Sequence, residues 1–148
     1  MTETEFHKQQ AVDLFNAVWT FMEKADRSVE DDDAMIHAAH ASRHHWAQVG
    51  EAANLARGEW QVSRVYCVLG RGEPALYHAG RCLAICEQHG IGDWDLAFAY
   101  ESLARAHAVA GNVADSCDNL DRAREAGEHI ADPQDRTLLL DDLATIRH

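Results

Sequence analysis

One set of residues in this chain has the type and spacing to bind carboxylates. Arg57, Trp60 and Arg64 recur at i, i+3 and i+7, which puts all three on one face of a helix. A guanidinium group binds a carboxylate through two parallel hydrogen bonds, and its plane stacks on aromatic rings. An aromatic ring between two arginines is therefore a receptor for an extended acidic peptide or a C-terminal carboxylate. A plainer interpretation pairs Arg57 with Glu51 and buries Trp60 in the core.

A second set has the type and spacing to bind a transition metal. At about 100° per residue, His37, His40 and His44 fall within an arc of about 60° on one helix face. Imidazoles one helical turn apart can converge on one ion, as they do in helical zinc sites. The alternative is a solvated polar stripe, with the histidines bonded to acids such as Asp33. We expect no resident cofactor, and a zinc or nickel ion bound there in purified protein would be adventitious.

The motifs of common catalytic sites are absent from the chain. There is no Gly-x-Ser-x-Gly, no phosphate-binding glycine loop and no dinucleotide-binding fingerprint. The acidic residues between positions 26 and 33 lack the alternating ligands and the closing glutamate of an EF-hand. We therefore expect that the protein is not an enzyme.

The overall charge argues against two classes of partner. The 148 residues include 25 acidic and 13 basic ones, for a formal charge of −12. Such a field repels phosphate groups, so we expect neither nucleic acid nor a membrane as a partner. The chain opens with no secretory signal, has no long apolar run, and places its four cysteines without a Cys-x-x-Cys spacing. These features predict a cytoplasmic protein whose cysteines are reduced core residues.

The elements that must position these residues are helices. Hydrophobic residues recur at helical spacing through almost the entire chain, and the breaks between the periodic segments are short. Gly70 and Gly111 mark helix ends, whereas Asp93 and the pair Asp132–Pro133 mark helix starts. No strand pattern competes, so we predict an all-α fold of about seven helices. Their expected ranges are 5–25, 30–49, 51–69, 72–89, 94–110, 113–130 and 133–146.

Parts of the chain repeat with a period of 41 residues. The second, fourth and sixth predicted helices begin at this spacing, and small residues align in them. The aligned positions are Ala34, Ala75 and Ser116, followed by Ala41, Cys82 and Ala123. Small residues at recurring positions let two antiparallel helices approach closely, and such self-similarity is typical of a stacked repeat architecture.

This pattern resembles the tetratricopeptide repeat. That family has an apolar-then-small pair and an aromatic residue in the first helix of each hairpin, then a glycine turn and small residues in the second helix. The matching residues are Val62-Ser63, Tyr66, Gly70, Ala75 and Cys82, then Leu103-Ala104, His107, Gly111, Ser116 and Ala123, with His107 replacing the aromatic. The resemblance implies one domain over residues 1–148, a right-handed solenoid of stacked antiparallel hairpins. Its parts would be a degenerate hairpin over 1–50, hairpins over 51–90 and 93–131, and a capping helix over 133–148.

The resemblance also implies a concave groove lined by the first helix of each hairpin. Transferring the family's groove positions onto this chain selects Arg57, Trp60 and Arg64, and then Glu101 and Arg105. We therefore expect a protein–protein interaction module, an adaptor that holds an acidic or carboxylate-ending peptide or partner in this groove. The competing interpretation for Arg105 is a structural ion pair with Glu101, one turn away.

Two alternatives remain at the level of function. The histidine set could make this a protein that binds a metal or a small ligand. The last helix could instead make it a structural homodimer, if the three leucines Leu138–Leu140 exceed what one helix face can bury when the helix caps the stack.

Overall fold

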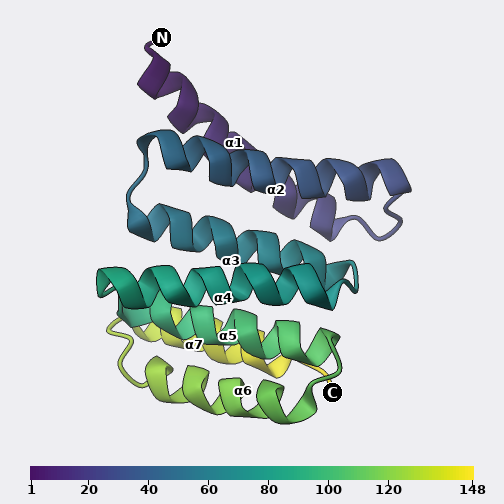
Figure 1. The fold of residues 1–148 in the computed structure, drawn as a ribbon, viewed down its shortest axis with the longest axis vertical. Helices are drawn as coiled ribbons and strands as arrows, with labels where there is room; N and C mark the ends of the chain where they lie inside the picture. The colour runs from purple at the N-terminus through teal and green to yellow at the C-terminus, as the bar shows by residue number, and fades with distance from the viewer.

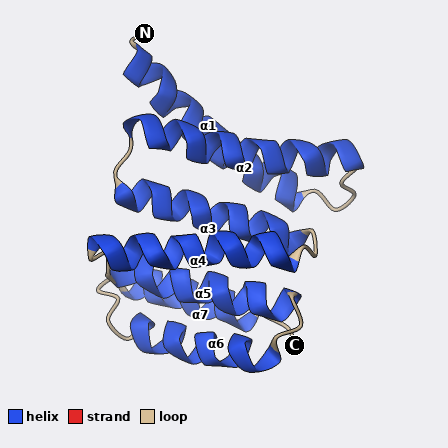
Figure 2. Ribbon diagram, in the orientation of Figure 1, coloured by secondary structure: helices blue, strands red, loops and turns tan.

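The prediction of an all-α fold is confirmed, with seven helices and no strand. A computed structural model describes residues 1–148, and Figures 1 and 2 show helices joined by short loops. The helices are α1 (Glu3–Glu23), α2 (Val29–Val49), α3 (Ala52–Val68), α4 (Gly72–His89), α5 (Asp93–Val109), α6 (Val113–Gly127) and α7 (Pro133–Ala144). The bounds lie within three residues of those predicted from the periodicity, and α7 ends four residues before position 148, the expected end of the capping helix.

Local side-chain signals account for several helix starts. Thr2 and Ser28 each form a capping box, in which the hydroxyl and a carboxylate three residues later satisfy two backbone N–H groups. Asp132 accepts the N–H of Gln134, and Pro133 occupies the first position of α7, where its missing N–H costs nothing.

The start of α5 differs from the prediction. Gly92 is the N-cap, and Asp93 is the first helical residue, in a left-handed conformation at φ 51°. The Asp93 carboxylate accepts the N–H of Trp94 and the N–H of Ala131. One side chain thus stabilises this turn and also the loop that leads into α7.

The helices form a stack of antiparallel hairpins. The pairs α1–α2, α3–α4 and α5–α6 pack most extensively, and neighbouring hairpins meet through α2 with α3, α4 with α5, and α3 with α5. The last helix, α7, packs on α5 and α6, and Figure 1 shows it behind α5 in the stack. The odd-numbered helices α1, α3, α5 and α7 therefore follow one another along one side of the molecule.

The 41-residue period recurs in the contacts between helices. In the second hairpin the hydroxyl of Ser63 donates to the carbonyl of Ala75 at 2.8 Å. In the third hairpin the hydroxyl of Ser116 donates to the carbonyl of Ala104 at 2.8 Å. Ser63 and Ala104 are equivalent positions in the repeat, as are Ala75 and Ser116. The same contact is therefore bridged by a serine of the first helix in one hairpin and by a serine of the second helix in the other.

The small residues aligned by this period lie in the core of the second and third hairpins. Ala75, Cys82, Ser116 and Ala123 are all buried, whereas the corresponding residues of the first hairpin are only half-buried. The prediction that all four cysteines are core residues is wrong for Cys117, which is exposed. The close helix approach that small residues permit is thus built fully into two of the three hairpins.

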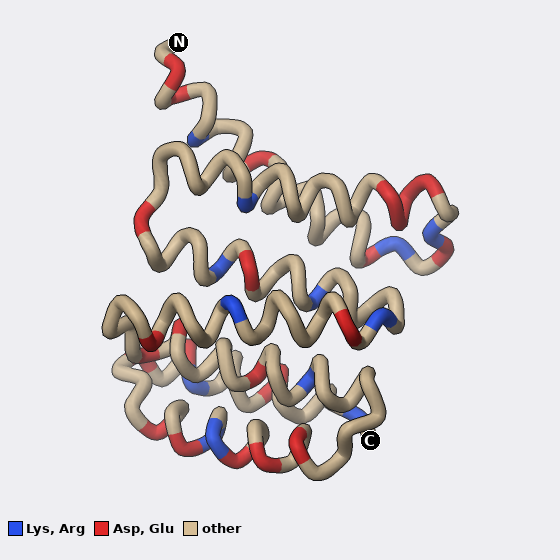
Figure 3. Tube along the Cα trace, in the orientation of Figure 1, with Lys and Arg blue, Asp and Glu red and all other residues tan.

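Acidic residues outnumber basic ones, and Figure 3 shows both kinds along the stack, with a run of acidic residues at the start of α2. None of the helices combines the length and the apolar character needed to cross a lipid bilayer.

Candidate functional site

The odd-numbered helices enclose a pocket of about 250 Å³. Its walls come from α1, α3, α5 and α7, and one residue of α4 adds to them. The lining residues are Trp19, Ala56, Arg57, Trp60, Arg64, Cys82, Trp94, Asp95, Phe98, Leu138 and Asp142. Because four helices from all parts of the chain contribute, the pocket exists only in the assembled stack.

Aromatic rings form a continuous series along this pocket. The ring centroids of Trp19 and Trp60 are 5.7 Å apart, and those of Trp60 and Phe98 are 5.9 Å apart at an interplanar angle of 84°. Trp94 meets Phe98 edge to face at 5.9 Å. These distances fall in the range in which aromatic pairs attract each other. The walls of the pocket are therefore rigid and predominantly apolar.

Arg57 closes one side of the pocket and is bound within the protein. Its Nε and Nη2 atoms donate to the two carboxylate oxygens of Asp95 at 2.9 and 3.0 Å. Its guanidinium carbon lies 4.5 Å from the ring centroid of Trp94. The hydrogen bonds to Asp95 raise the pKa of Arg57, so this guanidinium stays charged. The partner of Arg57 is thus Asp95 on α5, not Glu51.

The carboxylate of Glu101 is hydrogen-bonded to three of the predicted site residues. Its side chain is fully buried and accepts hydrogen bonds from Trp60 Nε1 at 2.8 Å, Arg105 Nε at 2.8 Å and Arg64 Nη2 at 3.5 Å. The predicted pairing of Arg105 with Glu101 is therefore present. Trp60 is half-buried and packs against two clusters of the core, so the plainer interpretation of a core residue holds in part.

The same arginines also bind the last helix. Arg64 Nη2 donates to the Asp142 carboxylate at 3.1 Å, and Arg105 Nη2 donates to the Asp142 carbonyl at 3.0 Å. Arg105 also reaches the Thr145 hydroxyl at 2.9 Å. α7 is thus tied to α3 and α5 by hydrogen bonds in addition to its buried leucines.

The charges around the pocket are balanced within the protein. Arg57, Arg64 and Arg105 are matched by the carboxylates of Asp95, Glu101 and Asp142. The structure brings the five predicted groove residues to one region, but each guanidinium already binds a carboxylate of this chain. These arginines therefore link the helices of the groove and are already occupied by carboxylates of this chain.

A repeat-period signal could have identified more of this site. Trp19, Trp60, Glu101 and Asp142 follow one another at intervals of 41 residues, one on each odd-numbered helix. Sequence analysis singled out only the middle two. Trp94 and Leu138 have no such signal, because their roles depend on how α5 and α7 pack.

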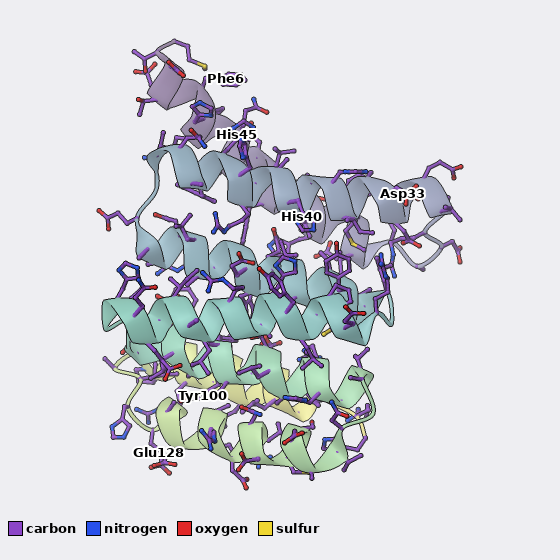
Figure 4. The ribbon with its side chains drawn as sticks, in the orientation of Figure 1. Phe6, Asp33, His40, His45, Tyr100 and Glu128 are labelled. Atoms are coloured by element: carbon purple, nitrogen blue, oxygen red, sulfur yellow. The ribbon has the colours of Figure 1, made fainter.

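The predicted histidine set is not assembled into one site. Nε2 of His40 shares a hydrogen bond with the Tyr66 hydroxyl at 2.9 Å, and its ring lies 5.3 Å from that of His78 on α4. His37 and His44 are exposed. No group of three or more His, Cys, Asp or Glu side chains is placed to hold a metal ion. Figure 4 shows His40 on the side of α2 that faces α3 and α4.

His40 instead belongs to a polar seam between α2, α3 and α4 that sequence analysis missed. Nδ1 of His78 lies 2.6 Å from the carboxylate of Glu59, which is buried and also 3.3 Å from Arg43. Burial lowers the pKa of His40, and the charge of His78 acts in the same direction. Burial would raise the pKa of Glu59, but the hydrogen bond and charge of His78 hold that pKa below its usual value.

Comparison of the chain with protein-family models, with curated proteins and with solved structures found no match in any of the three.

Proposed function

We propose that the protein is a non-enzymatic binding module, a short tetratricopeptide-like scaffold that holds a segment of a partner protein against its odd-numbered helices. The observation that supports this proposal is the aromatic pocket between α1, α3, α5 and α7. Pockets with apolar walls and a few polar groups are where proteins most often bind ligands. Aromatic residues and arginines dominate the binding energy of protein interfaces.

The state of the polar groups indicates what the pocket accepts. Its arginines and carboxylates are bonded to one another, so a charged group of a ligand would have to compete with ion pairs that are already formed. The half-buried indole of Trp19 and the exposed side chain of Leu138 offer apolar surface that can be covered without separating an ion pair. Burying apolar surface contributes about 25 cal/mol per Å². The anchor of the partner segment is therefore an apolar side chain, and the ion pairs shape the pocket around it.

Two leucines on α7 provide a matched test. Leu138 lines the pocket and is 57% exposed, whereas Leu140 is 49% exposed and lies outside the pocket. In a pull-down from native lysate, Leu138→Asp is expected to lose a partner that wild type and Leu140→Asp both retain. Circular dichroism would check that both variants are folded. Equal capture by all three proteins would contradict a binding site in this pocket.

The exposure of Leu140 also favours a second candidate, a homodimer formed through α7. Light scattering separates the two functions. A dimer in wild type that becomes a monomer in Leu140→Asp would support the structural role. A monomer in both proteins would rule it out.

A further inference from the structure

Three carboxylates on the helices that form the pocket have no ion-pair partner. Glu23 lies four residues after Trp19 on α1, so it lies on the same helix face, one turn further along. Asp135 and Asp141 lie three residues before and after Leu138 on α7. None of the three forms an ion pair, and Glu23 and Asp141 are exposed. The arginines that line the pocket are all paired, so these carboxylates are unmatched charges on the helix faces that carry Trp19 and Leu138.

One aromatic ring of the pocket also lacks a cation. The guanidinium of Arg64 lies over Trp60 at 5.3 Å, and that of Arg57 lies over Trp94 at 4.5 Å. Trp19 lines the pocket with no cation over its ring, and Glu23 is one turn away. A partner's lysine or arginine placed here would meet both an indole face and a carboxylate.

The size of the pocket suits one large apolar side chain. Its volume of about 250 Å³ exceeds that of an apolar cavity of roughly 150 Å³, which is known to accept benzene. A phenyl or indole ring is therefore within its capacity. The formal charge of −12 adds a long-range field to the local preference for a cation. This field attracts a cationic segment and repels an anionic one.

We propose that the ligand of this pocket is a basic peptide segment, in which a large apolar side chain packs into the pocket against Trp19, Trp60 and Leu138 while flanking lysines or arginines meet Glu23, Asp135 and Asp141. This inference rests on the proposed binding function and names the chemistry of the partner. It reverses the expectation of an acidic partner, because the groove arginines are bound within the chain.

The test uses synthetic peptides that differ only in their flanks. One phenylalanine is placed between lysines, between glutamines or between glutamates, and a fourth peptide has alanine between lysines. Three of the four tryptophans line the pocket, so intrinsic tryptophan fluorescence reports binding of peptides that contain none. We expect the lysine-flanked phenylalanine peptide to bind tightest, then the glutamine-flanked one, with the glutamate-flanked one weakest.

A double variant locates the charge preference. Glu23→Gln with Asp141→Asn removes two exposed carboxylates outside the pocket wall. Two weak, exposed ion pairs would be lost, so we expect the affinity for the lysine-flanked peptide to fall by about two- to thirtyfold. The affinity for the glutamine-flanked peptide should not change. Raising the salt concentration should reproduce the effect of the double variant.

Each other outcome overturns a distinct claim. Tightest binding of the glutamate-flanked peptide would refute the basic partner and leave the binding function standing. Equal binding of the phenylalanine and alanine peptides, with loss at high salt, would reduce the interaction to charge attraction and refute the apolar anchor. Binding of no peptide, at low or high salt, would refute the proposed function and the inference together.

Discussion

Glu101 illustrates how a single buried carboxylate organises this groove. It receives hydrogen bonds from Trp60, Arg64 and Arg105, so its charge is compensated although its side chain is inaccessible to water. A buried charge left without partners is costly, and the cost falls on whichever partner remains. The same reasoning makes Arg64→Glu a poor test of binding, because it would place a third carboxylate beside Glu101 and Asp142.

We predict that Glu101→Ala lowers the free energy of unfolding by about 3–5 kcal/mol, since it leaves an indole N–H without a partner and removes one acceptor from each of two partly buried guanidinium groups. Glu101→Gln retains an acceptor and should cost less, about 1–3 kcal/mol. Chemical denaturation measures both. The control is Asp118→Ala, which removes the exposed i, i+4 pair with Arg122 and should change stability by less than about 1 kcal/mol. Equal losses at positions 101 and 118 would contradict the buried network.

A second prediction at this scale concerns acid sensitivity. The pKa of His40 is lowered in the folded protein by burial and by His78, with Glu59 opposing and His37 adding to the shift. The unfolded chain therefore binds a proton at this position near pH 6.5, where the folded protein does not. Stability contributed by neutral His40 is complete above that pH and is lost as the pH falls through the lower folded value.

We expect His40→Gln to flatten the dependence of the unfolding free energy on pH just below 6.5, because glutamine does not titrate and can still bond the Tyr66 hydroxyl. Denaturation at a series of pH values measures this. Titration of Glu59 does not overlap with this effect, because its lowered pKa moves its contribution to the pH dependence of stability to more acidic pH. Parallel pH profiles for wild type and His40→Gln would contradict the assignment.

At the scale of single elements, α4 contains two glycines with opposite surroundings. A Cβ on Gly72 would lie 2.8 Å from the Cα of Ala110, which is backbone of the neighbouring hairpin and cannot move aside cheaply. A Cβ on Gly80 would meet nothing within 4 Å. The start of α4 is therefore a point of close approach between hairpins, whereas the middle of the helix has room.

We predict that Gly72→Ala lowers stability by about 1–3 kcal/mol through this clash. Gly80→Ala should raise it by up to about 1 kcal/mol, because alanine favours a helix interior over glycine. Thermal unfolding of the two variants provides a matched comparison within one helix. A stabilising Gly72→Ala would show that the hairpins do not meet as closely as described.

The whole molecule is a stack in which position determines how well a helix is supported. α3 packs against α1, α2, α4 and α5, and α5 packs against α3, α4, α6 and α7. The first hairpin has a neighbour on one side only, and Figure 1 shows the start of α1 projecting beyond α2. Local opening in proteins begins where packing is least.

We predict that native-state hydrogen exchange is slowest in α3 and α5 and faster in α1 and α2. Mass spectrometry of peptic fragments measures this, with each rate normalised to the intrinsic rate of its sequence. Uniform protection across all seven helices would indicate all-or-none opening instead of the graded opening typical of a solenoid.

The sequence by itself determined the helices, their approximate ends and the period of the stack. These follow from information carried within one or two turns: apolar spacing, the capping residues Ser28 and Asp132, and glycines such as Gly70 and Gly111 that adopt positive φ. The position of Asp93 at the start of α5 was predicted wrongly. Its carboxylate accepts the N–H of Ala131 in a loop far along the chain, and local sequence patterns carry no information about that contact.

Only the tertiary structure decided what the groove residues do. Sequence analysis named Arg57, Trp60, Arg64, Glu101 and Arg105, and these do lie together, but it could not pair Arg57 with Asp95 or Arg64 with Asp142. Those partners lie 38 and 78 residues apart in the chain. Helical periodicity determines which face of a helix a side chain occupies. Which other helix that face meets depends on the packing of the whole stack, and that packing turned expected ligand-binding arginines into internal ion pairs around an aromatic pocket.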